Sequence, residues 1–327
     1  MTDAQIAQVR RFNRVVTQRV GALDEAFLER GRPLGQARVL WEIGAEGADL
    51  RALRTRLGLD SGYLSRVLQA LVADGLVTVG SSALDGRVRT ARLTRAGRAE
   101  RAELDRRSDA VAAAILEPLA EPQRARLATA MAEIERLLTA SMVRLEPCDP
   151  AHPHALASLG AYFDELDERF DGGFDRARGT PDAPADLVPP AGLLVVATLG
   201  GEAVGCGVLR FHDVLGVVPG WAEIKRLWVA SSIRGLGLGK RLLVELERRA
   251  AEAGAPVVRL DTNRVLGEAI AMYRAGGYRE IERFNDNPYA HHWFEKDLAA
   301  KRVRRQSETA ASTRSTNAAS GTEPAQA

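Results

Sequence analysis

The feature that most limits what this chain can fold into is a glycine-rich turn that joins an apolar strand to a helix. The strand is predicted at residues 223–229, and residues 234–239, Arg-Gly-Leu-Gly-Leu-Gly, then place glycine at every second position. An apolar stripe typical of a helix follows, formed by Leu242, Leu243, Leu246 and Ala250. Such glycines let the backbone turn sharply and present successive N–H groups to an anion, and the helix adds the positive end of its dipole. The turn therefore predicts a binding loop for a diphosphate.

A dinucleotide-binding Rossmann loop is the competing interpretation of this turn. That fingerprint requires the spacing Gly-x-Gly-x-x-Gly between a strand and a helix. Residues 234–239 instead have the spacing Arg-x-x-Gly-x-Gly, with a basic residue in the lead. The spacing therefore favours a different kind of diphosphate-binding loop.

The segment resembles the GNAT superfamily of N-acetyltransferases, whose Arg/Gln-x-x-Gly-x-Gly/Ala loop holds the pyrophosphate of acetyl-CoA. The resemblance extends to both sides of the loop, over predicted strands at 193–197, 204–210, 257–263 and 292–296 and a helix at 268–275. It implies a GNAT domain at residues 142–299 with an α/β (α+β) fold and a mixed, mostly antiparallel sheet. It also implies acetyl-CoA as cosubstrate and a small-molecule or peptide amine as acceptor. No metal is expected, because Cys148 and Cys206 are isolated from each other and from any histidine cluster.

The same resemblance implies roles for particular residues. Tyr273 would be the acid that protonates the departing CoA thiolate, and Glu223 would be the base that takes a proton from the amine, directly or through a water. Asn263 would contact the arm of the cofactor. The other residues expected to bind the cofactor are Leu227, Trp228, Val229, Arg234, Gly235, Leu236, Gly237, Leu238, Gly239 and Lys240, together with Tyr273.

The first 140 residues contain a helix-turn-helix pattern. Asp49 is expected to cap a short helix that ends at Gly58, and a second helix is expected to begin at Ser61. The second helix has an apolar stripe formed by Leu64, Val67, Leu68 and Leu71, which turns Gly62, Ser65 and Arg66 outward. Small polar residues and an arginine at the outward N-terminal end are typical of a helix that enters the major groove of DNA.

A predicted β-hairpin follows the second helix. Residues 76–79 and 88–93 alternate like strands, and residues 81–86 form the tip between them. Arg87 lies just past this tip, where its guanidinium would reach a minor groove or a phosphate. The hairpin is therefore interpreted as the wing of a winged helix.

These patterns resemble the MarR family of winged-helix regulators, most clearly in the runs Leu-Val-Ala-Asp-Gly-Leu-Val at 71–77 and Leu-Thr-Arg-Ala-Gly-Arg at 93–98. The resemblance implies an all-α-rich winged helix-turn-helix domain with a β-hairpin wing at residues 1–140. Duplex DNA would be bound by Ser61, Gly62, Ser65, Arg66 and Arg87. Two outer helices would form a homodimer through the apolar stripes Ile6, Val9, Val16, Val20 and Leu127, Met131, Ile134, Leu138.

Charge and composition agree with a two-domain protein that contacts DNA. Residues 51–98 hold nine arginines against three aspartates, a local charge of +6, while the whole chain of 327 residues carries only +2. The chain has no apolar run long enough for a membrane helix and no signal-peptide pattern, so a cytoplasmic location is expected. The polar stretch at 300–327 is predicted to be a disordered tail.

Three functions are compatible with these patterns. The first is a bifunctional protein that regulates transcription and transfers acetyl groups from acetyl-CoA to an amine. The second is an acetyltransferase whose winged helix serves only dimerisation or protein docking, against which Arg66 and Arg87 count. The third is a DNA-binding regulator whose GNAT domain senses acetyl-CoA without turnover, against which Glu223 and Tyr273 count.

Overall fold

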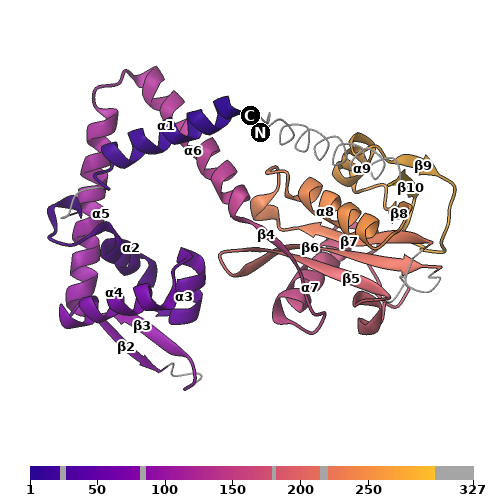
Figure 1. The fold of residues 1–327 in the computed structure, drawn as a ribbon, viewed down its shortest axis with the longest axis horizontal. Helices are drawn as coiled ribbons and strands as arrows, with labels where there is room; N and C mark the ends of the chain where they lie inside the picture. Colours follow the sequence, from indigo (N-terminus) through magenta and orange to yellow (C-terminus); the bar gives the residue numbers. More distant parts are fainter. Residues whose placement is uncertain (23–26, 82–85, 179–181, 214–219, 299–327) are drawn as a thin grey trace, which may run out of the picture. The chain divides into compact units, whose positions relative to one another are not determined.

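The computed structural model describes residues 1–22, 27–81, 86–178, 182–213 and 220–298, which form two compact units (Figure 1). The first unit comprises Met1–Arg136 and the second begins at Leu137. Two predictions lie outside the described residues, namely most of the wing tip (82–85) and the disordered tail (300–327). None of the helices in the described ranges is long and apolar enough to cross a membrane.

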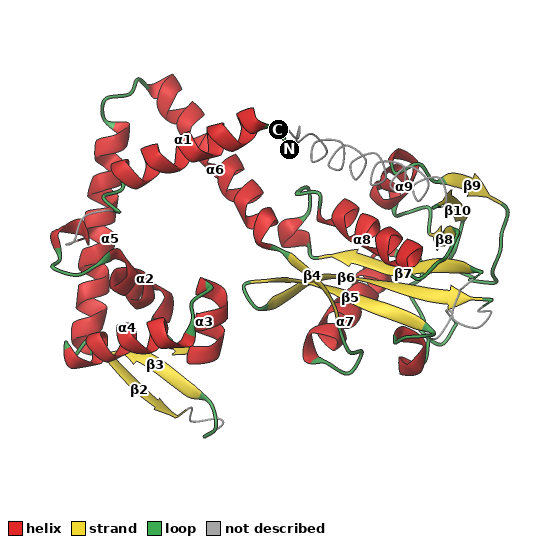
Figure 2. Ribbon diagram, in the orientation of Figure 1, coloured by secondary structure: helices red, strands yellow, loops and turns green. Residues whose placement is uncertain are grey.

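The N-terminal unit is mostly helical and carries a small antiparallel sheet (Figure 2). Its helices are α1 (Asp3–Arg19), η1 (Phe27–Glu29), α2 (Leu34–Ile43), α3 (Leu50–Leu57), α4 (Ser61–Ala73), α5 (Arg95–Leu116) and most of α6 (Glu121–Met142), which continues past Arg136. Its strands are β1 (Ala48–Asp49), β2 (Val77–Ser81) and β3 (Arg89–Leu93), in the order β1-β3-β2. This arrangement is the predicted winged helix.

Local capping explains where the two helices of the helix-turn-helix begin and end. The Asp49 side chain accepts a hydrogen bond from the Ala52 N–H at 2.7 Å, and the Asp60 side chain accepts one from the Tyr63 N–H at 2.8 Å. Gly58 ends α3 in the left-handed conformation, with φ of 63°. The predicted stripe of α4, formed by Leu64, Val67, Leu68 and Leu71, is buried in the core of the unit.

The second unit is built on a twisted sheet with the strand order β4-β5-β6-β7-β8-β10-β9. All neighbouring strands are antiparallel except β7 and β8, which are parallel. The bounds are β4 (Arg144–Pro147), β5 (Gly192–Leu199), β6 (Glu202–His212), β7 (Trp221–Val229), β8 (Val257–Thr262), β9 (Arg279–Ile281) and β10 (His292–Asp297). The sheet is mixed and mostly antiparallel, as predicted.

Helices cover both faces of this sheet. They are α7 (Pro153–Arg169), η2 (Pro184–Leu187), η3 (Ser231–Ile233), α8 (Leu238–Glu252) and α9 (Gly267–Ala275). The central strands are buried on both sides, so that Val195 packs in the core shared with α8 while its neighbour Leu194 packs in the core shared with α7. This double burial explains the nearly continuous apolar runs of β5 and β6.

The sheet is interrupted beside β7 at two places. The register between β6 and β7 shifts between Cys206 and Val208, whose partners on β7 are Trp228 and Lys225. Arg226 lies between these two partners and has a φ of 52°, as in a β-bulge. In addition, β7 and β8, both fully described, pair only at Ala222–Val258 and Glu223–Arg259. The C-terminal half of β7 is therefore unpaired on the β8 side, which leaves an opening in the middle of the sheet.

Candidate functional site

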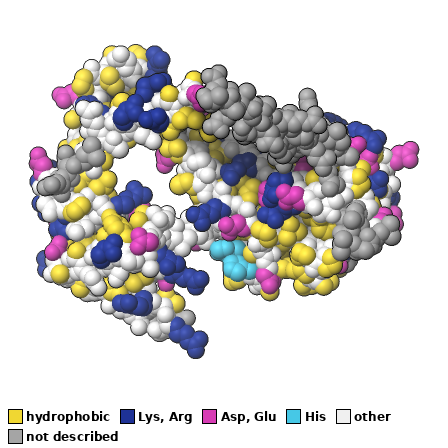
Figure 3. Space-filling model, viewed as in Figure 1, with side chains coloured by type: hydrophobic (Ala, Val, Ile, Leu, Met, Phe, Trp, Pro, Cys, Tyr) yellow, Lys and Arg dark blue, Asp and Glu magenta, His cyan; other side chains and the backbone are white. Residues whose placement is uncertain are grey.

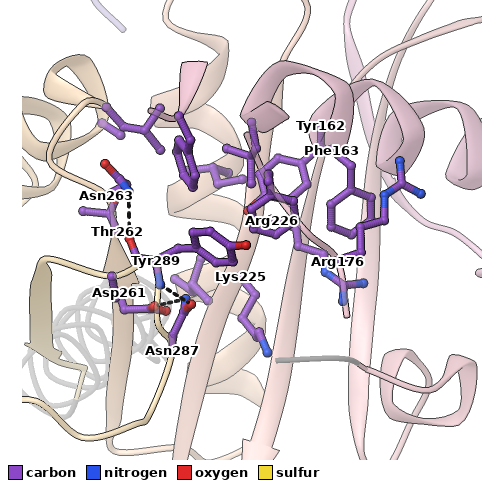
Figure 4. Close-up of a pocket in the computed structure, with 18 of the residues that line it drawn as sticks. Tyr162, Phe163, Arg176, Lys225, Arg226, Asp261, Thr262, Asn263, Asn287 and Tyr289 are labelled. Atoms are coloured by element: carbon purple, nitrogen blue, oxygen red, sulfur yellow. Dashed lines mark hydrogen bonds between the residues drawn. The ribbon is translucent and has the colours of Figure 1, made fainter. Parts of the chain in front are cut away.

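Two adjoining cavities lie at this opening. The loop cavity, of about 520 Å³, is lined by the glycine turn, the start of α8 and part of α9. The aromatic cavity, of about 300 Å³, is lined by aromatic residues, the middle of β7 and the end of β8 (Figure 4). They share Tyr162, Leu166, Leu227, Leu266, Ala269 and Tyr273, so a molecule in one can reach a molecule in the other.

The glycine turn has the backbone that the sequence predicted. Gly235 and Gly237 adopt left-handed conformations, with φ of 78° and 76°. Gly237 is the N-cap of α8 and supplies no side-chain hydrogen bond to the helix. The first N–H groups of an α-helix have no intrahelical acceptor, and here they border the loop cavity at Leu238, Gly239 and Lys240. This is the geometry of an anion site.

Arg234 holds the start of the turn against α7. Its Nε donates to the Val229 carbonyl at 2.9 Å, and its guanidinium pairs with Glu165, which also accepts a hydrogen bond from Trp228 Nε1 at 2.8 Å. Burial acts to raise the pKa of Glu165, but hydrogen bonds from Arg234, Trp228 and Arg169 outweigh it and lower that pKa. Arg234 therefore positions the loop, which leaves the backbone N–H groups facing the cavity.

Ten of the residues expected to bind the cofactor line the loop cavity, and two do not. Leu236 packs its side chain against the hydrophobic core of the unit. Asn263 is buried and lines the aromatic cavity instead, where its Nδ2 donates to the Tyr289 carbonyl at 2.8 Å. The lining residues are Leu227, Trp228, Val229, Arg234, Gly235, Gly237, Leu238, Gly239, Lys240 and Tyr273.

Tyr273 lies where the two cavities meet. Its side chain is buried on α9 and packs against the rings of Tyr278 and Phe294, with centroids 5.8 Å and 5.9 Å away. Burial, together with the charge of Asp261, raises the pKa of its hydroxyl well above the ordinary value. The hydroxyl therefore stays protonated at neutral pH.

Glu223 is buried on β7, in the stretch where β7 and β8 still pair. Its carboxylate lies 3.0 Å from His212 Nε2 and accepts a hydrogen bond from Asn285 Nδ2 at 3.4 Å. Within the described ranges, Glu223 is not among the residues that line either cavity. Glu223 therefore does not border the space that either cavity offers a ligand, and its role as the base stays a prediction.

Several lining residues of the aromatic cavity escaped the sequence analysis. Asp261, at the end of β8, accepts a hydrogen bond from Asn287, and burial raises the pKa of its carboxyl. Lys225 and Arg226 both contact the buried Asp182, at 3.2 Å and 2.8 Å. A carboxylate in the last two residues of a strand that leads into Asn263 was the available signal for Asp261.

The residues expected to contact DNA lie on one helix and the wing of the N-terminal unit. Ser61, Gly62, Ser65 and Arg66 are exposed on α4, and Arg87 is exposed beside the start of β3. All nine arginines between residues 51 and 98 are exposed, and basic side chains mark the end of the wing in Figure 3. This is a basic surface around a helix-turn-helix and its wing.

The outer helices of the same unit expose apolar side chains. Neither α1 nor α6 buries a single residue. The exposed fractions are 57% for Val9, 51% for Met131 and 55% for Leu138. Apolar stripes of this size on two helices are typical of surfaces that become buried in an assembly.

Two family models match the chain. Residues 30–88 match the MarR family, and residues 159–278 match the Acetyltransferase (GNAT) family. Among curated proteins, the chain is 36% identical over 101 residues to an uncharacterized N-acetyltransferase of Schizosaccharomyces pombe. It is 35% identical over 103 residues to the IAA acetyltransferase of Azospirillum brasilense. These matches cover 31% and 32% of this chain and 60% and 63% of the two relatives, so the chain spans less than two thirds of their length.

Solved structures similar to this chain match less than half of its length. A putative acyl-CoA N-acyltransferase from Klebsiella pneumoniae is 27% identical, with 48% of this chain and 98% of that chain covered and a TM-score of 0.38. CouR from Rhodococcus jostii, bound to p-coumaroyl-CoA, is 24% identical, with 37% and 87% covered and a TM-score of 0.32.

Proposed function

Taking the chain as a MarR-family segment joined to a GNAT-family segment, we propose that it is an acetyl-CoA-dependent N-acetyltransferase that carries its own DNA-binding domain. The observation that carries the enzymatic part is the meeting of two cavities at Tyr273. The loop cavity offers backbone N–H groups to a diphosphate, and the aromatic cavity offers room for an acceptor. We also infer a cytoplasmic location, because the protein would need access to both acetyl-CoA and DNA.

The reaction requires two proton transfers. An ammonium must lose a proton before its nitrogen attacks the acetyl carbonyl carbon, and the CoA thiolate must gain one as the C–S bond breaks. Tyr273 is the acid, because it lines both cavities at the point where they meet. Glu223 is the base and receives the proton through a water.

The enzymatic proposal is tested by release of CoA thiol from acetyl-CoA in the presence of amines. We expect thiol release that depends on an added amine, together with formation of the acetylated amine by mass spectrometry. Acetyl-CoA binding measured by calorimetry without any amine-dependent thiol release would support the sensing function instead. Absence of acetyl-CoA binding would refute the enzymatic proposal.

The regulatory part of the proposal rests on the exposed face of α4 and on Arg87. Phosphate contacts release counterions, so the affinity for DNA should fall with salt, with a log-log slope of about −0.9 per contact. Arg87→Ala should weaken binding to all sequences and flatten that slope by about one unit per protomer. Arg66→Ala should cost about 1–3 kcal/mol and relax base preference if it reads a guanine edge.

Fluorescence anisotropy with genomic fragments from the neighbourhood of the gene measures these effects. Two half-sites about one helical turn apart are expected, because the exposed stripes of α1 and α6 support a homodimer with two-fold symmetry. Light scattering of the free protein gives the mass of the assembly. No salt-sensitive binding at low ionic strength would contradict the regulatory proposal and leave dimerisation or docking as the role of the winged helix. A monomer would contradict the proposed homodimer and exclude dimerisation.

A further inference from the structure

The aromatic cavity carries two poles of opposite charge. Figure 4 shows Lys225, Arg226 and Arg176 on one side of it, and Asp261 with Asn287 on the other. Asp182 is the carboxylate nearest the cationic side, and its side chain is fully buried between Lys225 and Arg226. The two sides therefore differ in the charge that a small molecule would meet.

The cationic side has more positive charge than its two carboxylate partners can neutralise, because Asp182 is also paired with Arg210 at 2.6 Å. Lys225 and Arg226 contact Asp182, and Arg226 also lies over the ring of Phe163 at 5.2 Å. Arg176 lies 4.3 Å from the same ring, and its partner Asp164 is an exposed carboxylate 3.5 Å away. A lysine ammonium has three donors and a guanidinium five, so donors remain for a second anion. This side suits a carboxylate of the ligand.

The anionic side consists of a carboxylate with amide partners. Asp261 accepts a hydrogen bond from Asn287, and in the described part of the chain no cation lies within ion-pair distance of it. Burial is the largest cause and raises the pKa of this carboxyl, while hydrogen bonds from Asn287 and Asn285 and the more distant charge of Lys225 act to lower it. An ammonium group of the ligand would supply a cation in direct contact with Asp261, and Tyr273 lines the same cavity.

The wall between the two poles is aromatic. The rings of Phe163 and Phe174 stack with centroids 5.8 Å apart, and Phe174 lies 4.7 Å from the ring of Tyr289. Phe170 packs against the same tyrosine at 5.7 Å. The cavity of about 300 Å³ is at the small end of ligand pockets, which suits one small molecule better than a peptide chain.

From these three features we infer that the acceptor is a free α-amino acid with an aromatic or branched apolar side chain. Its carboxylate binds Arg176, Lys225 and Arg226, and its ammonium binds Asp261. The inference rests on the proposed acetyltransferase function. The α-nitrogen forms a bond to the acetyl carbon, the C–S bond breaks, CoA leaves as the thiol and the remaining proton goes to solvent.

The test compares acceptors that differ in one charged group. Thiol release is measured with L-phenylalanine, L-leucine, phenethylamine, L-phenylalaninamide and spermidine at saturating acetyl-CoA. Loss of one charge-assisted interaction should lower kcat/KM by about 10- to 100-fold for phenethylamine and the amide relative to L-phenylalanine. Equal or faster acetylation of spermidine or phenethylamine would overturn the inference while leaving the acetyltransferase function intact.

Two exposed arginines of the loop that follows α7, Arg176 and Arg178, provide a test variant and its control. Arg176→Gln should raise KM for L-phenylalanine about tenfold and leave KM for phenethylamine unchanged. Arg178→Gln, two residues along the same loop and also exposed but not lining the cavity, should change neither. A preference for L-phenylalanine that survives Arg176→Gln would count against the proposed carboxylate site.

Calorimetric titration of L-phenylalanine into the protein separates this inference from the function on which it rests. Binding that Arg176→Gln weakens and Arg178→Gln does not, without any acetyl transfer, would support the amino-acid site and refute the enzymatic proposal. Acetyl transfer to other amines, with no binding of L-phenylalanine or L-leucine, would refute the amino-acid site alone.

Discussion

Replacement of Gly237 by glutamate is the sharpest test of the anion site at the start of α8. Gly237 has a φ of 76°, and a Cβ built there meets no atom within 4 Å. A side chain in this conformation costs about 1–2 kcal/mol of backbone strain. In a unit of this size each kcal/mol lowers Tm by about 2–4 °C, so the variant should remain folded.

The effect on binding should be much larger than the effect on stability. The carboxylate of Gly237→Glu would lie beside the helix N–H groups that we assign to the diphosphate. Two like charges about 5 Å apart repel by about 3 kcal/mol at an effective dielectric constant of about 20. The affinity for acetyl-CoA should therefore fall by about 100-fold or more.

Isothermal titration with acetyl-CoA measures this loss, and two variants separate charge from strain. Gly237→Ala has the same backbone strain without the charge and should retain most of the affinity. Gly277→Glu places the same side chain at another exposed glycine, with φ of 84° and no atom within 4 Å of its Cβ, away from both cavities. A folded Gly237→Glu protein that binds acetyl-CoA as tightly as Gly277→Glu would refute the assignment of the loop.

Further predictions concern the proton-transfer groups and Asp261. Tyr273→Phe should lower kcat by about 100- to 10,000-fold with little change in acetyl-CoA affinity, and Glu223→Gln should do the same; less than a tenfold loss in both, where chemistry limits turnover, would contradict their roles. Asp261→Asn should weaken acceptor binding yet raise Tm at neutral pH. The pKa of Asp261 is raised on folding, so its ionised form destabilises the native state above the unfolded pKa of about 3.9. The gain in Tm should vanish below that pH, and a gain that is independent of pH would exclude ionisation as its cause.

Local patterns in the sequence were sufficient to predict the winged helix, the mixed sheet and the glycine turn. The helices α3 and α4 begin after Asp49 and Asp60, because the side-chain oxygen of the residue before a helix can accept a hydrogen bond from an N–H group in the first turn of that helix. The glycine turn could be recognised because only glycine adopts positive φ readily at Gly235 and Gly237. Matches to the MarR and GNAT families confirm the predicted order of the two segments.

Tertiary structure alone decided which side chains share the aromatic cavity. Strand alternation places adjacent residues on opposite faces, yet Lys225 and Arg226 both line this cavity because the bulge at Arg226 breaks the alternation. The GNAT resemblance implied that Glu223 is the base, yet Glu223 lines neither cavity, because β7 and β8 still pair at Glu223–Arg259 and separate only beyond it. A bulge and a loss of strand pairing depend on contacts between segments that are distant in the sequence. The two-residue alternation of side chains along a strand therefore could not reveal them.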